Sequence, residues 1–212
     1  MCTRYLMELS PELRPIIEAA RHSPLAGKMT DKLGKALKTE GEVYPTDMVP
    51  VIAPDRKGDR QIYPMIWGFS FPGMNRPIVN ARVETAPEKP SFKEGWKKRR
   101  CIIPASYYFE WDHVQVGNRM KVKDKYAIQP RNQQVTWLAG LYRIQQTDTG
   151  FQYPVFTVLT RDPSAELRKI HDRMPLILPE DAISDWVNPA TPASDVLWIS
   201  ENSLTDMVAL KC

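Results

Sequence analysis

The chain has 212 residues, of which 42% are hydrophobic and 25% charged, with a formal net charge of +4. A core of this size needs no disulfide or metal for stability, and the mild basic excess permits a nucleic-acid partner without requiring one. The three scattered cysteines, Cys2, Cys101 and Cys212, argue against a disulfide framework and a zinc site, so we expect no metal and no cofactor. Neither a long apolar run nor a signal-peptide pattern is present, which predicts a cytoplasmic protein without membrane contact.

The first half of the chain predicts one clear helix followed by strands. Ser10 can cap a helix that starts at Pro11, and the buried face of this helix is expected to hold Leu13, Ile16, Ile17 and Ala20. Residues 23–42, rich in Lys and Gly, predict a loop with room for a short helix. The proline-broken apolar runs 48–53 and 62–67 predict strands or edge strands. A loop at 68–77 and a short extended piece at 78–83 follow.

The second half alternates strands with short helices. The expected elements are a basic helix or turn at 91–100, strands at 101–104 and 106–111, a polar hairpin-like excursion at 113–125 with Gly117–Asn118 at its tip, strands at 126–129, 135–144 and 152–160, a helix from Asp162 to Ile170, and a small helix at 179–187 that buries Ile183, Trp186 and Val187. The 19 prolines, about twice the usual ~5%, are scattered and so favour many short elements. We therefore predict one α+β domain over residues 1–212, built on a curved mixed or antiparallel, barrel-like sheet with a few short helices.

Cys2 is the first residue with distinctive chemistry. Small residues in the second position generally permit removal of Met1, which would leave a thiol and a free α-amine on one residue. Their reference pKa values are ~8.5 and ~7.7–8.0, so each is partly deprotonated near neutrality. Such a pair condenses with an aldehyde to a thiazolidine, or attacks an amide or ester as an N-terminal nucleophile. The alternative is a small hydrophobic residue in the first strand.

His171 is the best placed of the three histidines to act as an acid or base. It stands at the end of a predicted helix, where the helix dipole favours a cationic imidazole, and Asp172 and Arg173 beside it could set its charge. The alternative is a helix C-cap with a hydrogen-bonded histidine.

Glu110 is surrounded by aromatic residues in the run Tyr107–Trp111. A carboxylate there is unfavourable unless it faces a cleft, and burial would raise its pKa and suit it to proton transfer. The alternative is that strand alternation turns Glu110, together with Tyr108, toward solvent.

Two further patterns suit nucleic acid. Strand alternation places Asn80, Arg82 and Glu84 on one face, where an amide, a guanidinium and a carboxylate can recognise a phosphate or a base edge. A cluster of cations around Trp96 suits a phosphate backbone with stacked bases; it comprises Lys93, Lys97, Lys98, Arg99 and Arg100. In both cases an ordinary solvated face is the alternative.

Taken in chain order, these residues form a recognisable series of motifs. The series is Met1-Cys2-x-Arg4-Tyr5, Trp67-Gly68, Asn80–Thr85 (NARVET), Cys101–Ala105 (CIIPA), Tyr108–Trp111 (YFEW), Phe156–Thr160 (FTVLT) and His171–Pro175 (HDRMP). It resembles the SRAP family, the SOS-response-associated peptidases that are also called abasic site processing proteins. The resemblance runs from Cys2 to about Val187.

The resemblance implies a protein that senses abasic sites in single-stranded DNA and crosslinks to them through a thiazolidine, a lyase-type activity. Met1 would first be removed by self-processing, a thiol-hydrolase activity, or by an aminopeptidase. Cys2 would be the nucleophile, Glu110 the proton shuttle, His171 the group that assists sugar ring opening and the reverse reaction, and Asn80 the residue that orients the sugar or the Cys2 amine. The implied DNA-binding residues are Arg4, Trp67, Arg82 and Arg173. The expected partner is single-stranded DNA with an abasic site, bound by a monomer that would associate with the nucleoid in a bacterium.

The sequence departs from the family pattern at three places. Thr3 stands where the family usually has glycine, and residues 43–46 read VYPT in place of Asn-x-Ala-Pro. The loop 71–75 lacks the usual tryptophans, so Phe71 or Met74 is expected to act as the apolar wedge in DNA. Two other functions stay open: an N-terminal cysteine amide hydrolase, which would need oxyanion donors that no Gly-rich run supplies, and a nucleic-acid-binding module without chemistry.

Overall fold

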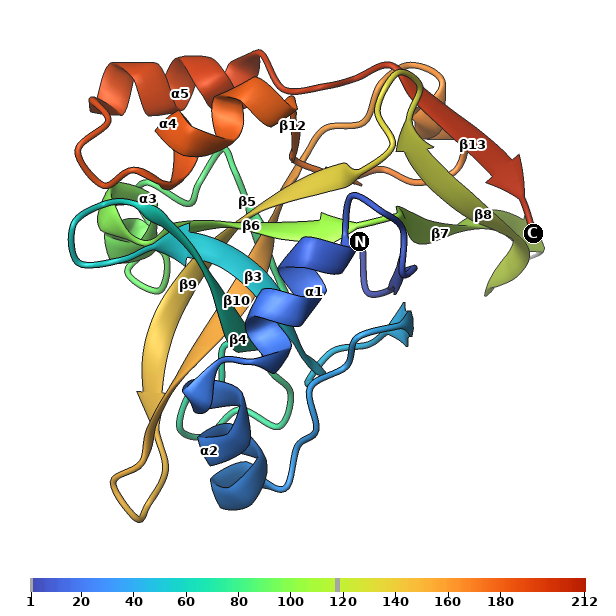
Figure 1. Cartoon of the computed structure of the whole chain (residues 1–212). Helices are drawn as coiled ribbons and strands as arrows, with labels where there is room; N and C mark the ends of the chain where they lie inside the picture. The colour runs from blue at the N-terminus through green and yellow to red at the C-terminus, as the bar shows by residue number, and fades with distance from the viewer. Residues whose placement is uncertain (1, 117–118) are drawn as a thin grey trace.

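The computed structural model describes residues 2–116 and 119–212 (Figure 1). It contains two β-sheets with short helices packed around them, which confirms the predicted α+β class and the barrel-like mixed sheet. The turn predicted at Gly117–Asn118 lies outside the described residues.

The larger sheet closes on itself. Its ring consists of β3 (Met48–Pro54), β4 (Arg60–Trp67), β6 (Arg100–Ala105), β9 (Thr136–Gln146) and β10 (Gln152–Arg161). They pair in the order β10, β4, β3, β6, β9 and back to β10. Three short strands extend the ring: β5 (Asn80–Arg82) and β11 (Met174–Pro175) beside β10, and β12 (Ile177–Leu178) beside β9. The sheet is mixed because β10 runs parallel to β4 and β5 but antiparallel to β9.

Proline is tolerated inside this ring at positions where the sheet pairs least. Pro50 of β3 lies opposite Pro64 of β4, and both are buried. Elsewhere β3 meets β6 only at Ile52, and β4 meets β10 only at its last two residues. The missing N–H groups of the two prolines therefore fall where a second neighbouring strand is not paired, which is where proline disturbs a sheet least.

The smaller sheet positions the N-terminal segment. It is antiparallel throughout and has the order β13-β8-β7-β1-β2. The bounds are β1 (Tyr5–Met7), β2 (Gly41–Val43), β7 (Tyr107–Val116), β8 (Arg119–Pro130) and β13 (Met207–Lys211). In Figure 1, β7, β8 and β13 extend to the right of the barrel, where the chain ends. The predicted strands at 101–104 and 106–111 correspond to β6 and β7, so consecutive strands of the chain lead from the barrel into this sheet.

The helices are α1 (Arg14–Arg21), α2 (Pro24–Leu33), α3 (Lys93–Lys98), α4 (Ile183–Val187) and α5 (Ala193–Glu201). Helix α1 begins three residues later than predicted, because residues 11–13 form a turn in which the Ser10 hydroxyl accepts from the Leu13 N–H at 3.3 Å. The small helix at 179–187 is confirmed as a 3-10 turn at Glu180–Ala182 followed by α4, and Ile183, Trp186 and Val187 are buried as expected. None of the helices among the described residues is long and apolar enough to cross a membrane.

Three elements differ from the sequence-based expectation. The helix predicted to reach Ile170 is only a 3-10 turn at Leu167–Lys169, since Leu167 is its one buried residue and so little apolar contact supports a longer helix. Helix α2 has ten residues where we expected mostly loop; it is capped by Ser23 and terminated by Gly34 at φ 65°. Helix α5 and strand β13 were not predicted.

Candidate active site

Cys2 is held in the interior, immediately before β1. Its side chain has no exposed surface, and its Sγ lies 3.8 Å from the carbonyl oxygen of Arg4. The side chain of Asn80, the first residue of β5, donates from Nδ2 to the Cys2 carbonyl oxygen at 2.7 Å. This bond joins residues 78 positions apart in sequence, and it ties the N-terminal segment to the barrel.

Glu110 reaches the same interior from β7. Tyr5 of β1 pairs with Tyr108 of β7, and the Phe109 N–H donates to the Arg4 carbonyl, so the residues before Tyr5 run beside those after Tyr108. Glu110 is only 4% exposed, which rules out the solvent-facing alternative. Burial raises its pKa to about 7.

Burial also changes the pKa of the Cys2 thiol. Its pKa is raised far above the ordinary value, first by burial and then by the negative charge of Glu110. The thiol is therefore neutral at rest, not partly deprotonated as the free reference value suggested. A base must remove its proton before Cys2 can attack through sulfur, and Glu110 is a nearby carboxylate that titrates near neutrality.

His171 is the neighbour of Asp172, whose charge acts on Glu110, and it is neutral near pH 7. Burial lowers the pKa of His171 below the ordinary 6.5. The helix dipole expected to raise this pKa is missing, because only a 3-10 turn precedes His171. Its Nδ1 lies 3.0 Å from the backbone N–H of Arg173 and 2.7 Å from Oδ1 of Asp172. The Arg173 N–H requires Nδ1 as acceptor, whereas the Asp172 carboxylate requires a proton on Nδ1, so the two contacts correspond to different protonation states of the ring. The charge of Asp172 contributes to the raised pKa of Glu110, which places the two motifs close together.

The buried side chain of Arg173 joins the HDRMP motif to the NARVET motif. It is 9% exposed and donates to the Thr160 carbonyl at 2.7 Å and to Oε2 of Glu84 at 2.8 Å, and it forms an ion pair with Asp162. Burial by itself would raise the pKa of Glu84, but the hydrogen bond and charge of Arg173 lower it below the ordinary value. The side chain of Arg173 thus holds together β10, the segment after β5 and the loop that contains His171. This corrects the expectation that it contacts DNA.

The sequence reasoning did not single out two tyrosine hydroxyls near Cys2. The hydroxyls of Tyr5 and Tyr108 are buried, and within the described residues neither they nor Oδ1 of Asn80 has a hydrogen-bond partner. The Cys2 charge acts on both tyrosines and helps to raise their pKa values, after burial as the main cause. Three polar atoms near one thiol are therefore available to a polar ligand. Their position in the MCxRY and YFEW motifs was the available signal.

The family model for SRAP, the SOS response associated peptidase, matches residues 1–209. The chain belongs to the SRAP family. Among curated relatives, "Abasic site processing protein YoaM" of Bacillus subtilis (strain 168) is 36% identical over 120 residues, which is 57% of this chain and 51% of the relative. "Abasic site processing protein HMCES" of Rattus norvegicus is 29% identical over 161 residues, 61% of this chain and 46% of the relative. The matched regions thus span about half the length of these relatives.

Solved structures share the SRAP fold of this chain. A protein from Bacteroides thetaiotaomicron aligns with a TM-score of 0.74 at 23% identity, covering 99% of this chain and 91% of that chain. A protein from Bordetella bronchiseptica aligns with a TM-score of 0.71 at 22% identity, covering 100% of this chain and 99% of that chain. At such identities the comparison speaks to the fold alone.

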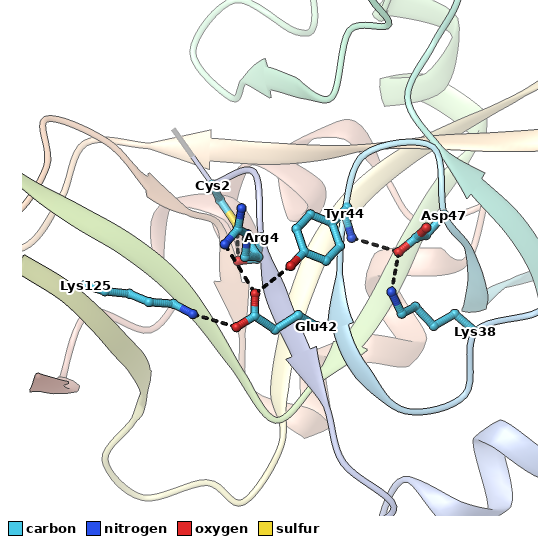
Figure 2. Close-up of polar contacts among 7 residues, drawn as sticks. All are labelled: Cys2, Arg4, Lys38, Glu42, Tyr44, Asp47 and Lys125. Atoms are coloured by element: carbon cyan, nitrogen blue, oxygen red, sulfur yellow. Dashed lines mark hydrogen bonds and ion pairs between the residues drawn. The ribbon is translucent and has the colours of Figure 1, made fainter. Parts of the chain in front are cut away.

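Arg4 lies next to Cys2 (Figure 2) and is partly exposed. Its guanidinium lies 3.3 Å from Oε2 of Glu42, 4.5 Å from the ring centre of Tyr44 and 4.9 Å from that of Trp111. Its side chain is 33% exposed, and Tyr44, which belongs to the sequence departure at 43–46, is 40% exposed. A cation between two aromatic rings therefore borders the buried Cys2, and this surface can meet a nucleic acid.

Glu42 is the centre of this surface cluster. Figure 2 shows Lys125 and Tyr44 converging on its carboxylate from two sides, with hydrogen bonds of 2.6 Å and 3.1 Å. The hydrogen bond from Lys125 is the main reason that the pKa of Glu42 lies below its ordinary value. The Lys125 ammonium also lies 3.6 Å from the ring centre of Phe109. The cluster ties β2 to β8 next to β1 and orders the strands around the site.

The other expected SRAP DNA-binding residues lie in different environments. Arg82 is exposed and Met74 is 50% exposed, whereas Phe71 is half-buried against the core. Trp67 has no exposed surface: its Nε1 donates to the Val79 carbonyl, and its ring packs against Phe156 and Tyr5. Trp67 therefore belongs to the core beneath the site and does not line a groove, which corrects the expectation.

The basic cluster at 93–100 divides between surface and interior. Arg100 is 1% exposed and donates to four backbone carbonyl oxygens, those of Trp96, Lys97, Trp186 and Asn188. Burial lowers its pKa to about 10. Trp96 is also buried, against Trp186. Arg100 thus fastens α3 to α4, and only the lysines and Arg99 stay available to an anion. Among the described residues, no group of three His, Cys, Asp or Glu side chains could hold a metal ion.

Proposed function

We propose that this chain processes abasic sites in single-stranded DNA by forming a thiazolidine between Cys2 and the ring-opened sugar. The observation that supports this best is the pairing of the buried Cys2 with Glu110, whose pKa of about 7 suits proton transfer in both directions near neutrality. The names of the relatives, abasic site processing proteins, agree with it.

The reaction begins once Met1 has been removed, because the amine of Cys2 must be free. The sugar ring opens when the proton of the C1′ hydroxyl moves to O4′ through solvent as the C1′–O4′ bond breaks, and the neutral His171 ring assists by hydrogen bonding to a sugar oxygen, which gives the aldehyde. The Cys2 amine adds to the aldehyde carbon, and protonated Glu110 supplies the proton with which the carbinolamine oxygen leaves as water. The products of this stage are a protonated iminium, water and the Glu110 carboxylate.

In ring closure Glu110 acts as a base. The Glu110 carboxylate takes the proton of the neutral thiol and Sγ adds to the iminium carbon, so that the nitrogen, which already carries its proton, becomes the neutral ring amine and Glu110 is protonated again. The sum is aminothiol plus aldehyde giving thiazolidine plus water. Asn80 holds the Cys2 carbonyl throughout, and the hydroxyls of Tyr5 and Tyr108 supply hydrogen bonds to sugar oxygens.

Incubation of Met1-processed protein with single-stranded DNA carrying one abasic site, followed by a denaturing gel, tests this function. We expect a heat-resistant shifted band that is lost in Cys2→Ala. Cys2→Ser keeps the amine but not the sulfur and should give only a labile imine, trapped by borohydride. Absence of a covalent band with retained DNA binding would refute the proposal and favour a binding module, and amine release from amide substrates would favour a hydrolase.

A further inference from the structure

We propose that a pocket beside α3 binds an undamaged nucleotide of the same DNA strand whose abasic sugar lies at Cys2; this inference rests on the proposed function. The pocket lies between α3, β9 and the loop that follows β4, and its volume is about 370 Å³. This is the lower end of the range for pockets that enclose a small ligand.

Aromatic rings form much of the pocket wall. Phe71 and Tyr142 are half-buried, and Phe69 is buried behind them against Phe92. A base presents a flat π-face whatever its identity, so half-exposed rings of this kind suit any nucleotide. Phe71 belongs to the loop 71–75, where this chain departs from the SRAP pattern by lacking tryptophans.

Two arginines supply the positive charge. The guanidinium carbon of Arg143 lies 4.6 Å from the ring centre of Phe71 and 5.7 Å from that of Phe69. Within residues 2–116 and 119–212, neither Arg143 nor Arg99 forms an ion pair. The carboxylate in the lining is Glu94, so the pocket keeps one positive charge in excess. A base can stack on the Arg143–Phe71 pair while the guanidinium groups meet its phosphate.

The surroundings favour a nucleic-acid strand over a free anion. Lys93, Lys97 and Lys98 of α3 are exposed next to Arg99, so cations continue from the pocket along the helix. A single small anion needs only the pocket, whereas a strand with successive phosphates also uses the lysines. Binding of a strand gives a role to the exposed lysines of the basic cluster, whereas Arg100 and Trp96 of the same cluster are buried.

The pocket lies within reach of the Cys2 site. Phe69 forms a β-bridge with Ile78, and Ile78 stands two residues before Asn80, which holds the Cys2 carbonyl. Two extended residues span ~7 Å and the gap between paired strands is ~5 Å, so the Phe69 wall lies roughly 10 Å from Asn80. That distance corresponds to about three stacked nucleotides at ~3.4 Å each.

The test measures affinity as a function of strand length. Fluorescence anisotropy is recorded with oligonucleotides that carry a tetrahydrofuran abasic analogue, which has no aldehyde, and one to six thymidines on its 5′ side or on its 3′ side. We expect affinity to rise at least fivefold when one of the two sides reaches about three nucleotides, because one stacked base contributes at least ~1 kcal/mol.

Arg143→Gln and Phe71→Leu should each reduce this long-to-short affinity ratio to near one. Arg14→Gln removes an exposed arginine of α1, which does not line the pocket, and should keep the ratio. Thermal unfolding of each variant excludes loss of the fold, and Arg99→Gln replaces either variant that unfolds. A wild-type protein without a length step, or a step that persists in all pocket variants, overturns the inference.

The aldehyde-bearing oligonucleotide on a denaturing gel separates this inference from the proposed function. If no covalent band forms but the length step is present and lost in Arg143→Gln, the crosslinking function fails and the nucleotide pocket stands. If the band forms and the length step is missing, the reverse holds.

Discussion

Replacement of Glu110 by glutamine should change the pH dependence of both stability and reaction. The folded protein holds this carboxyl at a pKa of about 7 because it is buried, whereas its ordinary value is 4.5. Between these two pH values the unfolded chain releases the proton and the folded chain keeps it. The free energy of unfolding therefore falls as pH rises from about 4.5 to about 7 and is constant above that. The difference between the two pKa values corresponds to about 3 kcal/mol.

Glutamine has nearly the same shape and no proton to lose, so Glu110→Gln is free of this destabilisation. The unfolding free energy of the variant, minus that of the wild type, should rise by about 3 kcal/mol between pH 4.5 and pH 8. Taking the difference removes the titration of Glu42, Glu84 and His171, which both proteins share.

Urea unfolding followed by tryptophan fluorescence at half-unit pH steps measures this difference, with Glu12→Gln, an exposed glutamate, as control for the loss of a carboxylate. In parallel, the wild-type crosslinking rate should show an inflection near pH 7 that Glu110→Gln lacks. A pH-independent stability difference would show that Glu110 is not held in its protonated form, and an unchanged rate profile would remove it from proton transfer.

Three other variants test separate parts of the site. Asn80→Ala leaves the Cys2 carbonyl without its donor and should slow crosslinking about tenfold, as ~1.4 kcal/mol of positioning is lost; a wild-type rate on the denaturing gel would contradict this role. Arg173→Met removes the Arg173 donor from the buried Thr160 carbonyl, while the exposed Glu84 carboxylate is solvated, so urea unfolding should show a loss of about 1–3 kcal/mol, and no measurable loss would mean that Arg173 has no structural role. Arg82→Gln should reduce the slope of log affinity against log salt by ~0.7, the value for one phosphate contact on single-stranded DNA; an unchanged slope would place Arg82 outside the DNA path.

The strands were easier to predict than the helices, for physical reasons visible in single elements. The apolar runs of β3, β6 and β10 are buried along nearly their whole length, so composition and proline spacing suffice to find them. Helix α2 buries only Ala26 and Met29, too few to produce a helical stripe, although its end signals at Ser23 and Gly34 were present. The opposite error occurred before His171, where good end signals produced only the 3-10 turn Leu167–Lys169, in which Leu167 is the one buried residue.

The sequence motifs proposed the residues of the candidate site but could not give their electrostatics. The motifs named Cys2, Asn80, Glu110 and His171, and tertiary contacts or electrostatic coupling connect each of them to this region. Reference values suggested a partly ionised thiol and a cationic histidine, but burial makes both neutral. The interior roles of Trp67, Arg100 and Arg173 were also invisible, because each depends on partners far away in the chain.

The sequence by itself determined the family and the α+β class, since these follow from motif order and from the pattern of apolar runs. The tertiary structure decided what state each group is in and which surface it serves. Desolvation and the choice of hydrogen-bond partner depend on every strand that closes around a side chain, so the pKa of Glu110, the neutral Cys2 and the inward turn of Arg173 exist only once the barrel and the second sheet have come together.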